Sequence, residues 1–318
     1  MEKRVHPDLR KMFSVMPAKS DSFNEGNIGE IRKNLDAMLK EMNKSKPKND
    51  SVLMTERSIP GPEGNPDVKV RIYEPQKRDG ILPGVLYIHG GGYIMGSSEI
   101  YDNQCQGIIS EIECVIMSVD YRLAPEHPFP ASLEDCYAAL KWFSENAEEL
   151  GVDSSRIAVV GGSSGGGLTA AVALLARDRK GPSIVFQMPL YPMIDDRIMT
   201  PSSNEIIDGR VWNKTSCQKA WKMYLGNNKG EVSPYAAPAR ATDLSGLPPA
   251  YTCVGDLDPF RDETMDYVAR LSQAGVATEF HLYPGCFHGF DGIVPNAEIS
   301  QRARKEYITA LKFALQNN

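Results

Sequence analysis

Short apolar runs alternate with amphipathic stretches along most of this chain. Strand-length apolar segments, several of them rich in β-branched residues, occupy 84–89, 115–119, 157–160, 183–190, 249–254 and 278–283. Longer stretches with apolar side chains at helical spacing separate them, and we expect helices over 99–111, 133–150, 168–176, 262–274 and 297–315. Near-continuous apolar strands separated by helices predict an α/β protein whose mostly parallel sheet is covered on both faces.

The N-terminal part and one internal interval depart from this alternation. A helical pattern over 28–43 is followed by two strand patterns, 52–59 and 68–73, with turn residues at 61–66 between them. These two strands bring the expected sheet to eight strands. From 195 to 247 we find no strand pattern, only a helix at 214–225 and proline-rich turns. We expect this interval to be an insertion over the carboxyl edge of the sheet, where ligands bind in such folds.

Five glycines and two serines join the strand at 157–160 to the helix at 168–176. A tight strand–turn–helix connection of this composition matches G-x-S-x-G, the nucleophile elbow, although a phosphate loop or a plain turn would have the same composition. Two registers fit, 161–165 and 162–166. We favour the second, with Ser164 as nucleophile, because Gly165 then offers its N–H to an oxyanion and Gly166 lets the helix pack closely on the sheet.

A serine nucleophile needs a histidine base that is oriented by a carboxylate. His288 follows the last predicted strand in a glycine-flanked loop, which is where an aimed imidazole is expected. The preceding strand ends near two candidate carboxylates, Asp256 and Asp258; we favour Asp258 because Pro259 directly after it is suited to starting the next helix. The chain order serine, aspartate, histidine is that of α/β-hydrolases.

A glycine run supplies candidate donors for the oxyanion of an acyl-transfer intermediate. His89 and three glycines follow an apolar strand, and the glycine backbone can turn its N–H groups inward without side-chain obstruction. We expect Gly91 and Gly92 to act as donors together with Gly165, and His89 to brace the loop rather than transfer protons.

Composition excludes several other classes of function. The 318 residues are 42% hydrophobic and carry a net charge of −6 without a basic block, which argues against a nucleic-acid partner. We find neither a secretory signal nor an apolar run long enough for a membrane span. The six scattered cysteines lack metal-ligand spacing, so we expect free thiols in a cytoplasmic protein and no metal.

Four stretches together resemble the hormone-sensitive-lipase-like branch (bacterial family IV) of the α/β-hydrolases. They are HGGGY at 89–93, YRLAPEHPFPA at 121–131, GSSGGG at 162–167, and DPFRDE at 258–263 with HGF at 288–290. The resemblance implies a Ser164–His288–Asp258 triad, favours Asp258 over Asp256, and implies esterase activity on short- to medium-chain acyl esters without a cofactor. It also implies a helical cap, made from 1–50 and 195–247, over a catalytic domain of 51–194 and 248–318.

The elbow departs from the family pattern. Members usually carry Asp or Thr before the nucleophile and Ala after it, whereas in the favoured register Ser163 and Gly165 occupy these positions.

The leading hypothesis is therefore a serine carboxylesterase that forms an acyl-enzyme on Ser164. A ligand-binding pseudo-hydrolase is the alternative from another class, and an amidase or lactonase would use the same triad. Met12, Phe13, Trp212 and Trp221 are candidates for setting substrate preference, although ordinary packing is the more common role of such side chains. Pairing of the strand at 278–283 across the sheet edge would make a homodimer.

Overall fold

The computed structural model describes residues 1–18, 21–44, 49–227 and 230–316, and its centre is one eight-stranded sheet. The strand order is β1-β2-β4-β3-β5-β6-β7-β8. The strands are β1 (Val52–Ile59), β2 (Val68–Pro75), β3 (Leu82–Ile88), β4 (Val115–Asp120), β5 (Val152–Gly162), β6 (Phe186–Leu190), β7 (Ala250–Leu257) and β8 (Thr278–Phe287). β2 pairs antiparallel with β1 and with β4, and every other pair is parallel. The predicted mostly parallel, eight-stranded sheet is confirmed.

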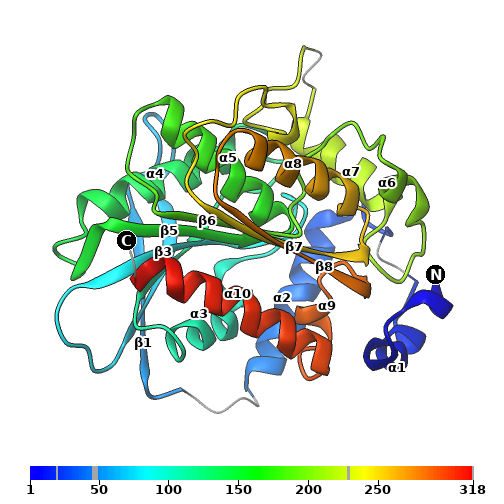
Figure 1. The fold of residues 1–318 in the computed structure, drawn as a ribbon, viewed down its shortest axis with the longest axis horizontal. Coiled ribbons are helices and arrows are strands. Elements are labelled where there is room, and N and C mark those ends of the chain that lie inside the picture. Colours follow the sequence, from blue (N-terminus) through cyan, green and yellow to red (C-terminus); the bar gives the residue numbers. More distant parts are fainter. Residues whose placement is uncertain (19–20, 45–48, 228–229, 317–318) are drawn as a thin grey trace.

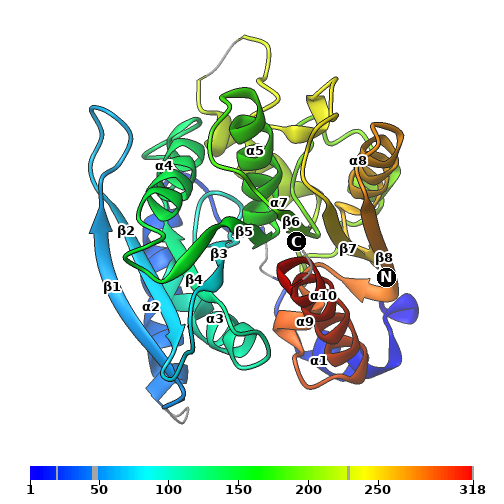
Figure 2. The same cartoon turned by 60° about the vertical axis from the view of Figure 1, so that its left-hand side comes forward.

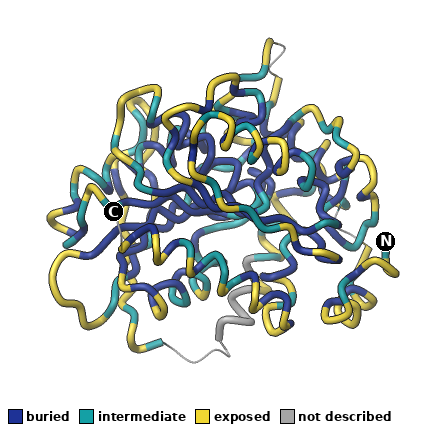
Figure 3. The backbone as a smooth tube through the Cα atoms, viewed as in Figure 1, coloured by how far each residue is buried: buried dark blue, intermediate teal, exposed yellow. Residues whose placement is uncertain are grey.

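Helices cover both faces of this sheet (Figures 1 and 2). One face carries α4 (Ala131–Glu145), α5 (Ser164–Asp178) and α8 (Arg261–Gln273). The other carries α3 (Asp102–Ile109), which follows the short η2 (Ser98–Tyr101), and α10 (Glu298–Gln316). The buried backbone is concentrated in the sheet and in the helix faces that touch it (Figure 3). The α/β architecture predicted from the alternation of patterns is therefore the observed one.

The central pair, β5 and α5, is buried almost throughout. Ile157 and Val159 on β5 and Leu168 and Val172 on α5 are all 0% exposed. Because both elements are enclosed by neighbouring strands and helices, the turn between them is held rigidly, which is what a strained catalytic turn requires.

The remaining helices gather toward one end of the sheet. η1 (Glu2–Arg4), α1 (Pro7–Val15) and α2 (Ile28–Lys44) precede the sheet, and α6 (Pro201–Glu205), α7 (Lys214–Leu225) and η3 (Pro238–Arg240) lie within the interval without strands. α1, α6 and α7 lie at the right of Figure 1, where the arrows of β7 and β8 end. The sequence pattern predicts α2 and α7, but it misses α1, α6 and the four-residue α9 (Phe290–Ile293). α6 and α9 are too short to show helical periodicity, and only Leu9 and Phe13 mark the buried face of α1.

Candidate active site

The turn between β5 and α5 places one serine at its apex. β5 ends at Gly162 and α5 begins at Ser164, so Ser163 stands alone between them, with φ 60° and ψ −123°. Such dihedrals are unfavourable for a residue with a side chain and persist only where the surroundings enforce them. Glycine lets the end of β5 approach the first turn of α5 closely, since a Cβ on Gly161 would stand 2.4 Å from the carbonyl oxygen of Gly165.

The structure contradicts Ser164 as the nucleophile. His288 Nε2 lies 2.9 Å from the Oγ atom of Ser163, which is partly exposed. Ser164 is the first residue of α5, and it is 0% exposed. The correct register is therefore 161–165, and the favoured register, 162–166, was wrong by one residue. The physical reason is that only the residue with positive φ projects from the turn toward the histidine.

Asp258 and His288 meet as the sequence predicts. His288 Nδ1 lies 2.7 Å from Oδ2 of Asp258, and the Asp258 side chain is 1% exposed. The other carboxylate oxygen of Asp258 accepts a hydrogen bond of 2.9 Å from the backbone N–H of Phe260. Ser163, His288 and Asp258 therefore form one continuous line of hydrogen-bonding groups. In this order the carboxylate can orient the imidazole and stabilise its protonated form.

Asp256 has a different place. Its Oδ1 accepts a hydrogen bond of 2.5 Å from the N–H of Gly285, in the loop that leads to His288. Its Oδ2 lies 3.9 Å from the guanidinium of Arg4. Asp256 thus ties the histidine loop to the N-terminal segment and makes no contact with the imidazole among the described interactions.

Aromatic rings surround His288. Phe260 and Tyr191 pack against it edge to face, with ring centroids 5.0 and 5.3 Å away, and Trp212 stands at 6.4 Å. Sequence reasoning missed Phe260 and Tyr191: the position of Phe260 two residues after Asp258 was a usable signal, whereas no local pattern marks Tyr191. Tyr191 also fills the space beside Gly162: a Cβ there would lie 3.0 Å from its ring.

The predicted glycine loop, Gly90–Gly92, lies against the elbow. A Cβ on Gly90 would stand 3.4 Å from the Cβ of Ser163. Gly91 and Gly92 adopt φ angles of 130° and 63°. These angles strain a side chain, and space is also missing: a Cβ would lie 2.0 Å from the carbonyl oxygen of Met95 at Gly91 and 2.6 Å from the ring of Trp212 at Gly92.

Gly165 loses its predicted role when the register is corrected. The residue after the apex is Ser164, so the N–H that follows the nucleophile is that of Ser164. Gly165 instead serves close packing, because a Cβ there would lie 2.1 Å from the carbonyl oxygen of Ile88. No residue but glycine fits at this contact between α5 and β3.

His89 braces the glycine loop from behind. Its Nδ1 lies 2.9 Å from the carbonyl oxygen of Gly90, and its ring stacks on Tyr121 with centroids 4.1 Å apart. The Tyr121 hydroxyl donates to the His89 carbonyl at 2.8 Å. Burial lowers the pKa of His89, which favours a neutral imidazole. The YRLAPEHPFPA stretch therefore supports the HGGG stretch directly, which explains why the two occur together.

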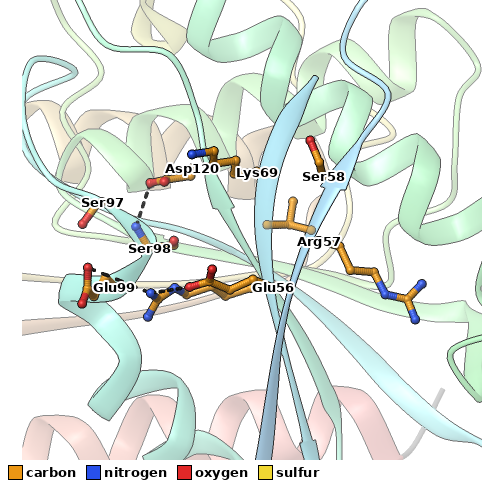
Figure 4. A pocket seen from close by; sticks show the side chains of 10 residues that line it. Glu56, Arg57, Ser58, Lys69, Ser97, Ser98, Glu99 and Asp120 are labelled. Atoms are coloured by element: carbon orange, nitrogen blue, oxygen red, sulfur yellow. Dashed lines mark hydrogen bonds and ion pairs between the residues drawn. The ribbon is translucent and has the colours of Figure 1, made fainter. Parts of the chain in front are cut away.

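Two hollows in the described part of the molecule lie away from the triad. One, of about 410 Å³, is lined by charged and hydroxyl side chains of β1, β2 and the start of η2 (Figure 4). There Arg71 pairs with Glu56 at 2.7 Å, and Asp120 accepts from the N–H of Ser98 at 3.0 Å. The other, of about 920 Å³, lies between α10 and the starts of β7 and β8. Neither contains a member of the triad.

Metal-binding clusters and membrane-spanning helices are both absent from the described part of the chain. Within the described ranges, no group of three or more histidine, cysteine, aspartate or glutamate side chains could hold a metal ion. Among the described residues, no helix has the length and apolar character needed to cross a membrane.

Comparison with known proteins shows the family to which the chain belongs. A family model described as the alpha/beta hydrolase fold matches residues 85–292, so the chain belongs to the α/β-hydrolase family. Within that family it belongs to the hormone-sensitive-lipase-like branch.

Its relatives include named esterases. Carboxylesterase NlhH of Mycobacterium tuberculosis is 35% identical over 98% of this chain and 96% of its own length. An arylesterase of Saccharolobus solfataricus is 38% identical over 71% of this chain and 74% of its own length. The solved structure of a bacterial heroin esterase superposes with a TM-score of 0.93 at 40% identity and covers 99% of both chains.

The corrected register also changes how the elbow departs from its family. With Ser163 at the apex, Gly162 replaces the usual Asp or Thr, and Ser164 replaces the usual Ala. Because Gly162 has no side chain, the ring of Tyr191 fills the space beside it. The second adds a buried hydroxyl at the start of α5 but leaves the backbone N–H in place.

Proposed function

We propose that this protein is a serine carboxylesterase with Ser163 as its nucleophile. The observation that carries the proposal is the line Ser163–His288–Asp258, with contacts of 2.9 and 2.7 Å, at a strained turn with positive φ. The names of the carboxylesterase, arylesterase and heroin esterase relatives support the same reaction class.

The reaction proceeds in two acyl transfers. The Oγ atom of Ser163 attacks the ester carbonyl carbon while His288 Nε2 takes its proton, and Asp258 holds the imidazolium through Nδ1–H. The tetrahedral intermediate collapses, the C–O bond to the alcohol breaks, and His288 returns its proton to the leaving oxygen. Water then attacks the acyl-enzyme with His288 as base, which releases the acid and restores Ser163.

The oxyanion of each intermediate needs backbone donors. We assign this role to the N–H groups of Gly91, Gly92 and Ser164. The first two lie in the braced glycine loop beside the elbow, and the third is at the N-terminus of α5, where the helix dipole favours negative charge. A single such donor typically contributes about 2.7–4 kcal/mol to transition-state stabilisation.

We assign the N-terminal part (1–50) and the insertion (195–247) to a cap over the catalytic domain formed by 51–194 and 248–318. Packing between the two cap segments supports this assignment. Arg210 lies 4.0 Å over the ring of Phe13, and Phe23 stacks on Trp212 with centroids 5.7 Å apart.

Of the four candidates for setting substrate preference, we propose Trp212. It stands beside Gly92, where a Cβ would lie 2.6 Å from its ring. Phe13 packs against Phe287 instead, and Trp221 is 3% exposed. A bulky indole beside the donor loop favours short to medium acyl chains.

We also propose that the protein works in the cytoplasm and forms a homodimer. The state of the cysteines supports the cytoplasm: all six are buried and free, as expected in a reducing compartment.

The edge of the sheet supports the homodimer. β8 is an edge strand, and two apolar side chains, Leu282 of β8 and Phe313 of α10, are 39% and 69% exposed.

A pair of serine variants tests the nucleophile. We expect Ser163→Ala to lose at least about 10³-fold in kcat on p-nitrophenyl acetate, because the attacking atom is gone. Ser164→Ala keeps its backbone N–H and is expected to lose less than about tenfold.

A fluorophosphonate probe provides a second readout that needs no turnover. Peptide mapping should find the phosphonyl group on Ser163 in the wild type and in Ser164→Ala. A label on Ser164, or substantial turnover by Ser163→Ala, would overturn the assignment. An unlabelled wild type would instead favour a ligand-binding pseudo-hydrolase.

A further inference from the structure

The turn that carries Asp258 is completed by a residue from the insertion. α8 begins at Arg261, three residues after Asp258, and its N-cap residue, Phe260, makes no side-chain capping hydrogen bond. The first N–H groups of a helix need partners from outside the helix. One partner comes from α6, since the N–H of Asp262 donates to the Oγ atom of Ser202 at 3.1 Å. Ser202 therefore caps α8 from another segment of the chain.

Two more hydrogen bonds make this contact reciprocal. The Ser202 hydroxyl donates to the carbonyl oxygen of Pro259 at 2.9 Å, and the Ser202 N–H donates to Oδ2 of Asp262 at 2.7 Å. The Thr200 hydroxyl lies 3.3 Å from the same Oγ atom. Ser202 is 0% exposed, so water cannot replace these partners.

The bonds of Ser202 bracket the catalytic carboxylate. Pro259 follows Asp258 directly, and Oδ1 of Asp258 accepts from the N–H of Phe260, one residue further along. A shift of this turn would therefore move the carboxylate that faces His288. α6 lies against the start of α8 (Figure 1), so this part of the insertion reaches the turn and makes no contact with the triad among the described interactions.

A second connection runs parallel to the first. Arg261 donates to the backbone oxygen of Asp256 at 2.8 Å and pairs with Glu205 of α6 at 3.5 Å. Arg4 of the N-terminal segment also pairs with Glu205. The insertion and the N-terminal segment thus converge on the loop between Asp256 and Asp262.

We propose that Ser202 is a positioning residue for Asp258: it holds the 258–262 turn so that the carboxylate keeps its place beside His288. This rests on the proposed function, in which Asp258 orients the catalytic imidazole. The insertion then has a part in the chemistry besides covering the site.

The test compares two neighbouring buried serines. Ser202→Ala leaves the Pro259 carbonyl and the Asp262 N–H without their partner, and kcat on p-nitrophenyl acetate should fall by about tenfold, a typical effect of losing buried hydrogen bonds. KM should change less than about twofold, because no substrate contact is lost. Ser203→Ala is the matched control: Ser203 is 2% exposed, but its hydroxyl bonds to Thr200 within its own segment. Its kcat should stay within about twofold of wild type.

A double substitution separates positioning from general support of the fold. In an Asp258→Asn background the carboxylate is already gone, so adding Ser202→Ala should change kcat by less than about twofold. An equal loss in both backgrounds, or Ser202→Ala behaving like Ser203→Ala, would overturn the proposal. Ser202→Cys, which keeps the volume but bonds weakly, serves if the alanine variant does not fold and should lower kcat in the same direction.

These variants distinguish the role of Ser202 from the proposed function. If Ser163→Ala stays active, the proposed function is wrong whatever Ser202 does. If Ser163→Ala is inactive but Ser202→Ala turns over like the control, only the positioning role is wrong.

Discussion

Glu263 is a carboxylic acid that the fold keeps almost out of water. It is 4% exposed, and its Oε1 atom accepts hydrogen bonds from the N–H groups of Ile194 and Asp195, at 2.9 and 3.2 Å. Burial is the main cause that raises its pKa well above 4.5, and the nearby Asp195 adds to the rise. Glu263 thus anchors the point where the chain leaves β6 for the insertion, and it favours the neutral form there.

This raised pKa predicts how stability changes with pH. A group with a folded-state pKa above its unfolded value stabilises the fold fully at low pH, and that contribution is lost as pH rises from about 4.5 through the folded pKa. Glu263→Gln keeps an oxygen acceptor and has no charge to bury. The Tm of the variant, relative to wild type, should therefore rise with pH across this window, by about 2 °C or more, as measured by thermal unfolding at a series of pH values.

Glu126 supplies a control of opposite sign. A side-chain hydrogen bond from Arg32 lowers the pKa of Glu126, so its contribution is present above about 4.5 and is lost as pH falls. Relative to wild type, Glu126→Gln should lose stability as pH rises. If the Tm difference between Glu263→Gln and wild type stays constant with pH, or falls as it does for the control, burial of the Glu263 carboxyl does not set this pH dependence.

At the scale of elements, the loop between α6 and α7 brings an aromatic side chain to the triad. Trp212 lies beside Gly92 of the donor loop, stacks on Phe23, and stands 6.4 Å from the ring of His288. Three segments distant in sequence therefore enclose the space next to Ser163. We propose that the size of the indole limits how large an acyl group fits there.

Removing the indole should widen acyl preference. With Trp212→Ala, the ratio of kcat/KM for p-nitrophenyl octanoate to that for the acetate should rise about tenfold or more, since each buried methylene is worth about 0.8 kcal/mol. Trp212→Phe should give a smaller rise. Trp221→Phe is the control, because Trp221 packs against the stacked rings of Tyr93 and Tyr224, and it should leave the ratio unchanged. An unchanged ratio in Trp212→Ala would mean that other residues limit the length of the acyl chain.

All eight strands, the longer helices and the meeting of Asp258 with His288 were predictable from the sequence. Apolar runs locate all eight strands, and α7 was predicted with its observed bounds, Lys214–Leu225. Asp258 and His288 follow from strand ends at one edge of a parallel sheet, which topology brings together.

The nucleophile was not predictable in the same way. Both Ser163 and Ser164 satisfy G-x-S-x-G, and they differ only in which residue ends the strand and which begins the helix. That boundary is set by contacts such as Gly165 against Ile88, which come from a different strand. The roles of Ser202 and Tyr191 were not predicted for a related reason: their partners lie far away in sequence, and no local pattern marks these two residues.

At the scale of the whole molecule, the sheet ends differently on its two sides. β1 pairs antiparallel with β2 and is exposed along most of its length, whereas β8 is flanked by the helix α10. The hollow of about 920 Å³ between α10 and the starts of β7 and β8 has Phe313 at its rim, 69% exposed. An edge strand beside exposed apolar side chains is a surface that a second copy can cover by extending the sheet.

The proposed dimer makes a direct prediction about mass. Sedimentation should give about twice the chain mass of 35.1 kDa for the wild type. Leu282→Glu combined with Phe313→Glu places charge on the proposed contact and should yield the single-chain mass, because burying unpaired carboxylates opposes association. Met199→Glu is the control, since this apolar side chain is 77% exposed in the insertion and away from β8, and the dimer should persist. A wild type at 35.1 kDa would refute the dimer, and a double variant that stays paired would place the contact on another face.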